Sequence, residues 1–336
     1  MHRELSKERV ELFRRNYGLL GEEIGKRIVG YREVINQVLT AMMAGGNVLL
    51  EGVPGLGKTL LVRTIGEATQ MDFQRIQFTP DLMPADITGT NIIHTDDKGG
   101  RSFRFQPGPI FSNLVLADEI NRATPKTQSA VLEAMQEGRV TVGGTTHKLP
   151  DPFWVLATQN PIEMEGTYPL PEAQIDRFIY KIDVRPQGED ELLGIIRRTT
   201  GDEHAQLKPV LNREQIIDMQ ATVRQVMAAE FVQRYAARIA LGTHPHSEHA
   251  TDMTRRFVRF GVSPRGVQSL ILCAKVRAIL DDRYTISCED IREVAPPALR
   301  HRIIRSFEAE AEGITSDAVL KSLLESVKEP AAVRAA

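Results

Sequence analysis

Short apolar runs alternate with helical patterns along the first half of the chain. Between residues 31 and 43 the apolar positions recur with helical spacing, and Gly45 and Gly46 end that segment. Apolar runs typical of buried strands lie at residues 47–50, 73–78, 114–117, 153–157 and 178–184. Helical patterns separate them at residues 58–69 and 125–136. Strands that alternate with helices predict an α/β fold with a parallel sheet and helices on both faces.

The pattern changes after Pro186. Helical patterns then follow one another, and no further run predicts a strand. Asn212 is suited to cap one of these helices, Pro264 to begin another, and Ser287 with Asp290 to cap a third. We therefore expect two domains and a tail. They are an α/β domain over residues 1–186 with a polar helical segment at its start, a smaller all-helical domain over residues 187–330, and a frayed tail over residues 331–336.

Length and composition agree with a globular protein of two domains. The chain has 336 residues, of which 42% are hydrophobic, and a single core rarely keeps growing at this size. Its 42 Lys and Arg nearly balance 44 Asp and Glu, so no global charge attracts nucleic acid. Cys273 and Cys288 form no disulfide framework, the charged opening segment has no signal-peptide pattern, and no apolar run approaches the roughly 18 residues of a membrane span. We expect a cytoplasmic protein without a membrane span.

Residues 52–59 form a phosphate-binding loop. Their sequence, GVPGLGKT, matches G-x-x-x-x-G-K-T, and it lies between a predicted strand and a predicted helix. Glycines let backbone N–H groups approach phosphate oxygens, Lys58 adds a positive charge, and the Thr59 hydroxyl is a ligand for Mg²⁺. The expected ligands are therefore ATP or ADP with Mg²⁺. The loop residues expected to bind the nucleotide are Gly52, Pro54, Gly55, Leu56, Gly57, Lys58, Thr59 and Leu60.

Two carboxylates and an amide follow neighbouring strands of the predicted sheet. Asp118 and Glu119 end one apolar run, and Asn160 comes shortly after the next. In a parallel sheet these side chains lie at the edge where the phosphate loop also lies. Asp118 is thus expected to hold Mg²⁺ with Thr59, Glu119 to deprotonate the attacking water, and Asn160 to orient that water.

Five segments, taken together and in order, resemble the MoxR family of AAA+ ATPases. They are residues 51–59 (EGVPGLGKT), 116–123 (LADEINRA), 128–137 (QSAVLEAMQE), 157–161 (ATQNP) and 170–178 (LPEAQIDRF). Each motif alone occurs in many ATPases, whereas the ordered set is specific. The resemblance covers about residues 28 to 300.

The resemblance implies further roles. Ile28, Val29 and Gly30 match the residues that contact adenine, and Asn160 matches the first sensor of the family. Arg177 matches the arginine finger that reaches a neighbouring subunit, and Arg265 matches the second sensor, on the helical lid. The expected catalytic set therefore consists of Lys58, Glu119, Asn160, Arg177 and Arg265. A homo-oligomeric ring, a hexamer, is implied.

Two inserted hairpins are also implied. Residues 139–148, with Gly143 and Gly144 at the turn, resemble the hairpin before the first sensor, and residues 87–105, with Gly99 and Gly100 at the centre, resemble the insertion in the second helix. In related ATPases these hairpins face the substrate channel.

Several alternatives stay open from the residues alone. Arg122 competes with Arg177 as the contact across the subunit interface, and His244, His246 and His249 are interpreted as a solvated loop rather than a zinc site. The family implies chaperone-like remodelling or maturation of a protein client, with a partner that bears a von Willebrand factor A domain. The alternatives are a nucleic-acid motor or a chelatase-type motor subunit, and a scaffold that binds ATP without hydrolysing it disagrees with the complete catalytic set.

Overall fold

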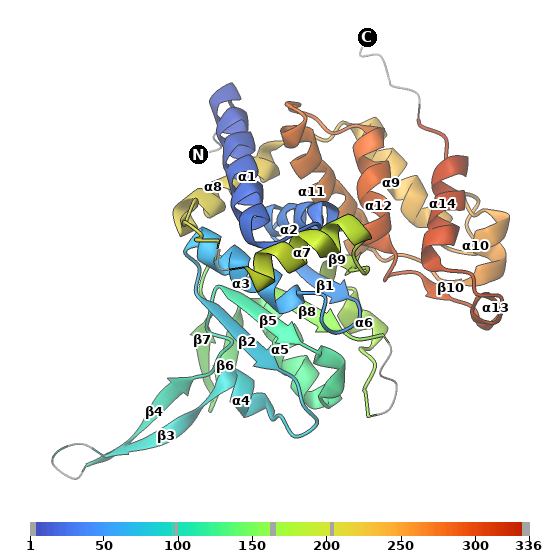
Figure 1. The fold of residues 1–336 in the computed structure, drawn as a ribbon. Coiled ribbons are helices and arrows are strands. Elements are labelled where there is room, and N and C mark those ends of the chain that lie inside the picture. The colour runs from blue at the N-terminus through green and yellow to red at the C-terminus, as the bar shows by residue number, and fades with distance from the viewer. Residues whose placement is uncertain (1–4, 96, 98–99, 162–165, 202–204, 331–336) are drawn as a thin grey trace.

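A five-stranded parallel sheet forms the centre of the first domain. The computed structural model describes residues 5–95, 97, 100–161, 166–201 and 205–330 (Figure 1). The sheet has the strand order β2-β5-β8-β1-β9. Its strands are β1 (Asn47–Glu51), β2 (Phe73–Gln77), β5 (Leu114–Asp118), β8 (Trp154–Gln159) and β9 (Phe178–Asp183). The expected parallel sheet is therefore present. Because β1, β5 and β8 are neighbours or near neighbours, their carboxyl ends meet at one edge.

Alternate residues of the strands face two separate apolar layers. Leu50, Leu116 and Leu156 lie in one layer with α1 (Lys7–Arg27), α2 (Arg32–Met43) and α3 (Lys58–Thr69). Leu49, Ala117 and Val155 lie in the other, with α5 (Pro125–Glu137). This period of two explains why the strands appear as continuous apolar runs, since both faces of the sheet are covered by helices.

Several short helices and hairpins lie at the edge of the sheet and in the connections between its strands. The hairpin of β3 (Gly89–Thr95) and β4 (Arg101–Pro107) projects from the molecule, and the shorter hairpin of β6 (Arg139–Val142) and β7 (Thr145–Lys148) follows α5 (Figure 1). The first insertion begins in α4 (Pro84–Thr88), so Ile87 is helical rather than extended, and Gly99 lies outside the described residues. The other short elements are the 3-10 helix η1 (Ile120–Arg122) and α6 (Glu172–Ile175).

The C-terminal part is helical except for one small antiparallel pair. β10 (Val258–Phe260) pairs with β11 (Ile304–Arg305), a feature that the helical patterns did not predict because each strand is only two or three residues long. The helices are α7 (Glu189–Thr200), α8 (Arg213–Gln225), α9 (Glu230–Gly242), α10 (Asp252–Phe257), α11 (Pro264–Leu280), α12 (Cys288–Leu299), α13 (Phe307–Ala311) and α14 (Ser316–Ser326).

Caps in this part follow the predicted positions. Asn212 accepts a hydrogen bond from the backbone of Gln215, and Ser287 and Asp290 cap each other reciprocally. Cys273 and Cys288 are both buried as free thiols. Residues 331–336, predicted as a tail, lie outside the described residues. Among the described helices, none is both long and apolar enough to cross a bilayer.

Candidate nucleotide site

The phosphate loop connects β1 to α3 at the carboxyl edge of the sheet. Gly55 and Gly57 have φ values of 84° and 76°, a left-handed conformation that favours glycine. A Cβ at Gly52 would lie 2.5 Å from the carbonyl oxygen of Val184, so the close approach of β9 also requires glycine. Lys58 Nζ donates to the carbonyl oxygen of Gly52 at 2.5 Å. Burial lowers the pKa of Lys58, while Asp118, Glu119 and Glu51 oppose that change.

Asp118 has partners on both carboxylate oxygens. The Thr158 hydroxyl donates to Oδ1 at 2.6 Å, and Arg75 donates to Oδ2 from Nε at 2.9 Å and from a terminal nitrogen at 2.7 Å. The Thr59 hydroxyl also points to Oδ2, at 3.4 Å. The carboxylate is therefore buried but compensated, since a buried charge without partners would be costly.

Glu119 adopts a left-handed backbone conformation, with φ 56° and ψ 49°. Its N–H leaves the strand ladder and donates to the Thr158 hydroxyl at 2.8 Å. Its Oε2 accepts from Gln77 Nε2 at 3.1 Å and from Arg122 at 3.0 Å. The carboxylate of Glu119 is thus held by polar donors on the adjacent strand β2 and the following turn.

Asn160 follows β8 at the same edge and is buried. Its carbonyl oxygen accepts a hydrogen bond from Asn121 Nδ2 at 3.4 Å. The two strand ends thereby carry Asp118, Glu119 and Asn160 to one place beside the phosphate loop. Arg122, the competitor of Arg177 for a contact between subunits, pairs with Glu119 of its own chain at 3.0 Å.

The donor set suits a magnesium ion. Mg²⁺ is usually bound by one or two protein oxygens together with water and substrate phosphates, rather than by a cage of side chains. The Thr59 hydroxyl and the Asp118 carboxylate, 3.4 Å apart beside the loop, supply such oxygens. Within the described part of the chain, no cluster of three or more His, Cys, Asp or Glu side chains forms an all-protein metal cage.

Ile28 and Val29 line one pocket with Gly55, Leu56, Gly57 and Leu60 of the phosphate loop and its helix. Helix α7 also lines this pocket, through Ile195, Arg198 and Thr199, which the sequence did not indicate. Arg198 fastens α7 there, because it donates to the carbonyl oxygens of Gly25 and Lys26 at 2.9 and 2.7 Å.

Gly30, Gly52, Pro54, Lys58 and Thr59 are not among the residues that line this pocket in the described structure. The last four belong to the phosphate loop and the start of its helix, where Lys58 binds the carbonyl oxygen of Gly52 and Thr59 faces Asp118. Gly30 has φ 69°, and a Cβ there would lie 2.6 Å from the Glu191 carboxylate, so this position favours glycine, and the next residue, Tyr31, lines the pocket.

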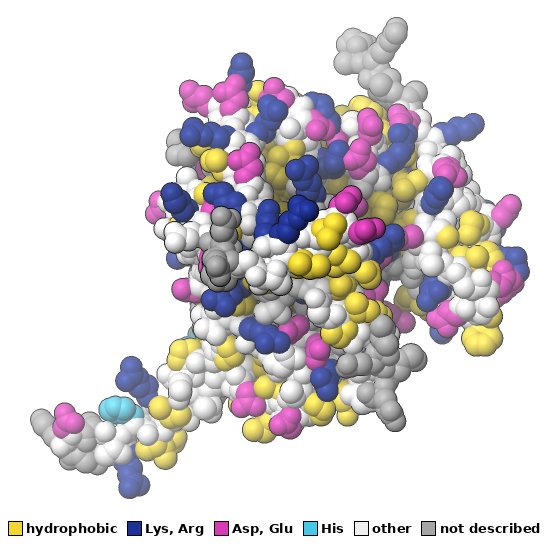
Figure 2. All heavy atoms as spheres, viewed as in Figure 1, with side chains coloured by type: hydrophobic (Ala, Val, Ile, Leu, Met, Phe, Trp, Pro, Cys, Tyr) yellow, Lys and Arg dark blue, Asp and Glu magenta, His cyan; other side chains and the backbone are white. Residues whose placement is uncertain are grey.

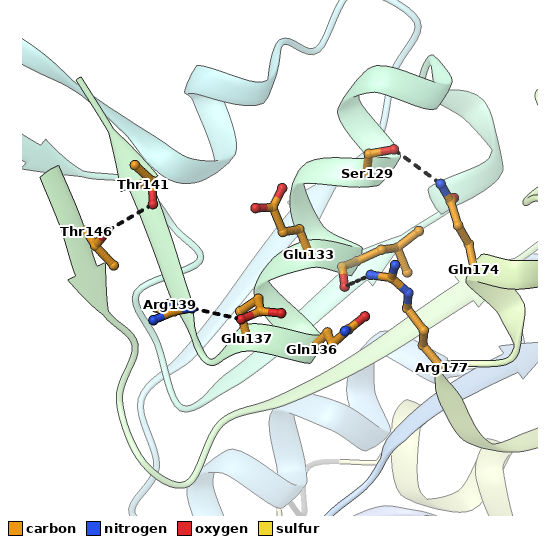
Figure 3. Close-up of a pocket in the computed structure, with 10 residues that line it drawn as sticks. Ser129, Glu133, Gln136, Glu137, Arg139, Thr141, Thr146, Gln174 and Arg177 are labelled. Atoms are coloured by element: carbon orange, nitrogen blue, oxygen red, sulfur yellow. Dashed lines mark hydrogen bonds and ion pairs between the residues drawn. The ribbon is translucent and has the colours of Figure 1, made fainter. Parts of the chain in front are cut away.

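Arg177 lies in a different pocket, between α5 and the β6–β7 hairpin. Figure 3 shows its side chain facing α5, the helix from which Glu133, Gln136 and Glu137 also line this pocket. It donates to the carbonyl oxygen of Leu132 at 2.7 Å, and among the described residues its buried Nε has no hydrogen-bond partner. The fold therefore does not bring Arg177 into the phosphate-loop pocket of its own chain.

Arg265 is the second residue of α11, after Pro264, and it faces the turn between α6 and β9. Its guanidinium is 3.9 Å from Asp176, and it lines neither the loop pocket nor the Arg177 pocket in the described structure. The motif thus predicted that Arg265 lies on the lid, but it could not predict that Asp176 is its neighbour.

Two of the missed residues around Asp118 and Glu119 share a sequence signal. Arg75 and Gln77 are polar and two positions apart in β2, whose sequence is FQRIQ. Such spacing places both on one face of β2, and it could have indicated a polar neighbour for the next strand. Thr158 gave no comparable signal, because a threonine inside an apolar strand is ordinary.

Comparisons with known proteins match both parts of the chain. Residues 47–180 match the model of the ATPase family associated with various cellular activities (AAA), and residues 250–323 match the AAA lid domain.

Similar proteins extend over most of the chain. The uncharacterized protein YeaC of Bacillus subtilis is 44% identical over 92% of this chain and 93% of its own length. Chaperone MoxR1 of Mycobacterium tuberculosis is 40% identical, over 92% of this chain and 81% of its own, and Protein MoxR of Methylorubrum extorquens is 31% identical, over 92% and 93%. A crystal structure from Cytophaga hutchinsonii, with a provisional assignment as an ATPase, is 40% identical and superposes with a TM-score of 0.89 over 96% of this chain and 97% of that one.

Proposed function

The chain belongs to the MoxR family of AAA+ ATPases, and we propose that it hydrolyses ATP within a ring of identical subunits to remodel or mature protein clients. ATPase activity itself follows from the family. The observation that carries the proposal is the arrangement of Thr59, Asp118 and Glu119 at the phosphate loop: the Thr59 hydroxyl is 3.4 Å from Asp118, and Asp118 and Glu119 share the Thr158 hydroxyl. Lys58 binds the loop carbonyl of Gly52, and its charge interacts with Asp118 and Glu119.

Each residue of this assembly has a proposed role in phosphoryl transfer. Lys58 and the loop N–H groups bind the β- and γ-phosphates, while Ile28 and Val29 contact the base. Thr59 and Asp118 hold Mg²⁺, which neutralises phosphate charge when bound. Glu119 takes a proton from water as the water oxygen bonds to the γ-phosphorus and the bond to the β-phosphate oxygen breaks, and Asn160 orients that water.

The ring supplies the remaining charge. Arg177 lies in a pocket separate from its own phosphate loop, which supports a role on the nucleotide of an adjacent subunit. A finger delivered in this way stabilises the charge of the transition state, and it makes turnover depend on assembly. A hexamer is the proposed ring, and Arg265 is proposed to link the lid to the nucleotide state.

The client is proposed from the relatives. Chaperone MoxR1 is named as a chaperone, which supports remodelling or maturation of a protein client. A cytoplasmic location and a partner that bears a von Willebrand factor A domain are proposed from the resemblance of the motifs alone. One observation favours a second candidate, a nucleic-acid motor. The projecting β3–β4 hairpin exposes Phe103 close in sequence to Arg101 and Arg104, and Figure 2 shows hydrophobic and basic side chains together on this hairpin. An aromatic ring beside cations can stack on bases.

One titration separates these possibilities. ATP turnover per subunit is measured against protein concentration for the wild type and Arg177→Ala, with and without DNA. A cooperative rise in turnover per subunit, lost in the variant and indifferent to DNA, is expected. Turnover per subunit that stays flat and survives the substitution would remove the shared-site mechanism, and stimulation by DNA that weakens with salt would favour the motor.

A further inference from the structure

A buried arginine of the lid binds the turn that carries Arg177. Arg302 follows α12, and its side chain is only 2% exposed. Its Nε donates to the Asp176 carboxylate at 2.7 Å, and one terminal nitrogen donates to the carbonyl oxygens of Asp176 and Phe178 at 3.0 and 2.7 Å. Arg302 therefore holds the residues on both sides of Arg177.

Other lid residues bind the same two positions. Ser263, the N-cap of α11, donates to the two carboxylate oxygens of Asp176 at 3.0 and 2.9 Å. His301 binds the carbonyl oxygen of Phe178 at 3.0 Å, and Arg265 lies 3.9 Å from Asp176. The lid thus meets this turn from α11 and from the residues after α12.

Asp176 and Arg177 point to different partners although they are adjacent. Asp176 binds the lid, whereas Arg177 reaches the carbonyl oxygen of Leu132 on α5 (Figure 3). A guanidinium taken out of water is tolerated only where its charge is paired and its donors are bonded. Arg302 meets that condition only while the turn keeps its present position against the lid.

We propose that Arg302 and Asp176 are positioning residues that clamp the turn carrying the arginine finger, Arg177. The lid of one subunit thereby sets the position of the finger that this subunit presents to the nucleotide of the next subunit. This inference rests on the proposed role of Arg177 in trans. A lid that shifts with its own nucleotide carries the clamped turn, and Arg177 with it. Binding or release of nucleotide in one subunit thereby changes the ATP turnover of its neighbour.

A test in mixed rings distinguishes this role from simple packing. Asp176→Asn keeps the shape of the side chain and removes its charge, which weakens the clamp with little change in volume. Alone, it is expected to lower turnover about 10- to 100-fold, the loss that small misplacements of reacting groups cause. Glu119→Gln alone is also expected to be nearly inactive.

The mixture of these two variants is expected to regain activity. An Asp176→Asn subunit donates a misplaced finger but keeps an intact Glu119, whereas a Glu119→Gln subunit keeps the intact clamp and finger. A shared site is competent where the first kind of subunit supplies Glu119 and the second kind supplies the finger. In a random one-to-one mixture about a quarter of the interfaces join a competent site to a competent finger. Turnover near a quarter of the wild-type value supports the proposal, and a mixture no more active than its parts overturns it.

Matched variants complete the design. Arg300→Met removes other contacts of the lid, the 2.9 Å ion pairs with Asp183 of β9 and with Asp317 of α14, without touching the turn; its turnover per folded subunit should stay within about twofold of wild type. Ser263→Ala loosens the clamp while the buried pair stays intact, so it provides the same mixing test if Asp176→Asn unfolds. The mixture of Arg177→Ala with Glu119→Gln tests the premise: if that mixture also stays inactive, the trans mechanism has failed rather than the clamp.

Discussion

The Thr158 hydroxyl donates to Asp118 Oδ1 at 2.6 Å while it accepts the N–H of Glu119 at 2.8 Å. One fully buried side chain on β8 therefore holds Asp118, the proposed magnesium ligand, and Glu119, the proposed base, in a fixed relation at the end of the neighbouring strand. The left-handed backbone of Glu119 turns its N–H toward this hydroxyl. Asn160 lies two residues after Thr158, just beyond the end of β8.

Removal of that hydroxyl should impair catalysis more than folding. Thr158→Val leaves the N–H of Glu119 without its acceptor, at a cost of about 1–3 kcal/mol in unfolding free energy, and turnover should fall further than that stability loss explains. Thr158→Ser should restore most of the turnover. The control is Thr222→Val, where a buried hydroxyl bonds only to the carbonyl oxygen of Asp218 on its own helix. Equal kcat values for the two valine variants, measured with saturating MgATP, would contradict the assignment.

Arg75 should compete with magnesium for Asp118. Its two donors occupy Oδ2, the oxygen that also faces the Thr59 hydroxyl. For Arg75→Gln the magnesium concentration that gives half-maximal turnover should therefore fall, roughly two- to fivefold, the scale of a partly exposed ion pair. Arg63→Gln, which breaks the exposed pair with Glu67, is the control. A magnesium titration of both variants at fixed ATP decides, and a higher requirement in Arg75→Gln refutes the competition.

Glu119→Gln should separate nucleotide binding from hydrolysis. The amide keeps the size of the side chain, and the phosphate loop is unchanged, so ATP affinity should stay within about threefold while turnover drops by 10²–10⁴ as expected for loss of a general base. Binding is followed with a fluorescent ATP analogue and turnover by phosphate release. Normal phosphate release from this variant would exclude Glu119 as the base.

His301 should make the protein less stable in mild acid. Burial and the nearby cations Arg302, Lys181 and Arg300 lower its pKa well below the usual 6.5, against the hydrogen bond to Phe178. Below pH 6.5 the unfolded chain therefore binds a proton that the folded chain does not. As the pH is lowered, the unfolding free energy decreases by up to about 1.4 kcal/mol per pH unit, until the pH reaches the pKa of His301 in the folded protein.

Urea unfolding at pH 7.5, 6.5 and 5.5 measures this slope. His301→Gln, whose amide can still donate to the carbonyl oxygen of Phe178 without titrating, should be less stable at pH 7.5 but show a shallower slope. The same slope in both proteins would assign the acid sensitivity to other groups.

Much of the fold could be predicted because its signals are local. A helix or strand needs only the spacing of neighbouring side chains, and α3 has the bounds that the pattern predicted. The phosphate loop is local too, since glycines, lysine and threonine lie within eight consecutive residues. The short β10–β11 pair was missed because two or three residues are too few for a period to show.

The expected site was partly assembled by the fold and partly separated. Asp118, Glu119 and Asn160 meet beside the loop because they end parallel strands of one sheet, a relation that strand order in the sequence implies. Gly30 has a left-handed backbone close to Glu191, and Arg265 lies against Asp176 rather than in the loop pocket. The motif identified these positions but could not identify their neighbours.

The sequence by itself determined the elements, the phosphate loop and the order of its motifs, since each is encoded by residues close together in the chain. Only the tertiary structure decided that Arg75 and Thr158 bind Asp118 across 43 and 40 residues, and that Arg302 binds Asp176 across 126. Such contacts depend on strand order and on how the lid packs. The free energy of one buried ion pair is set by those neighbours and leaves no periodic trace in the sequence.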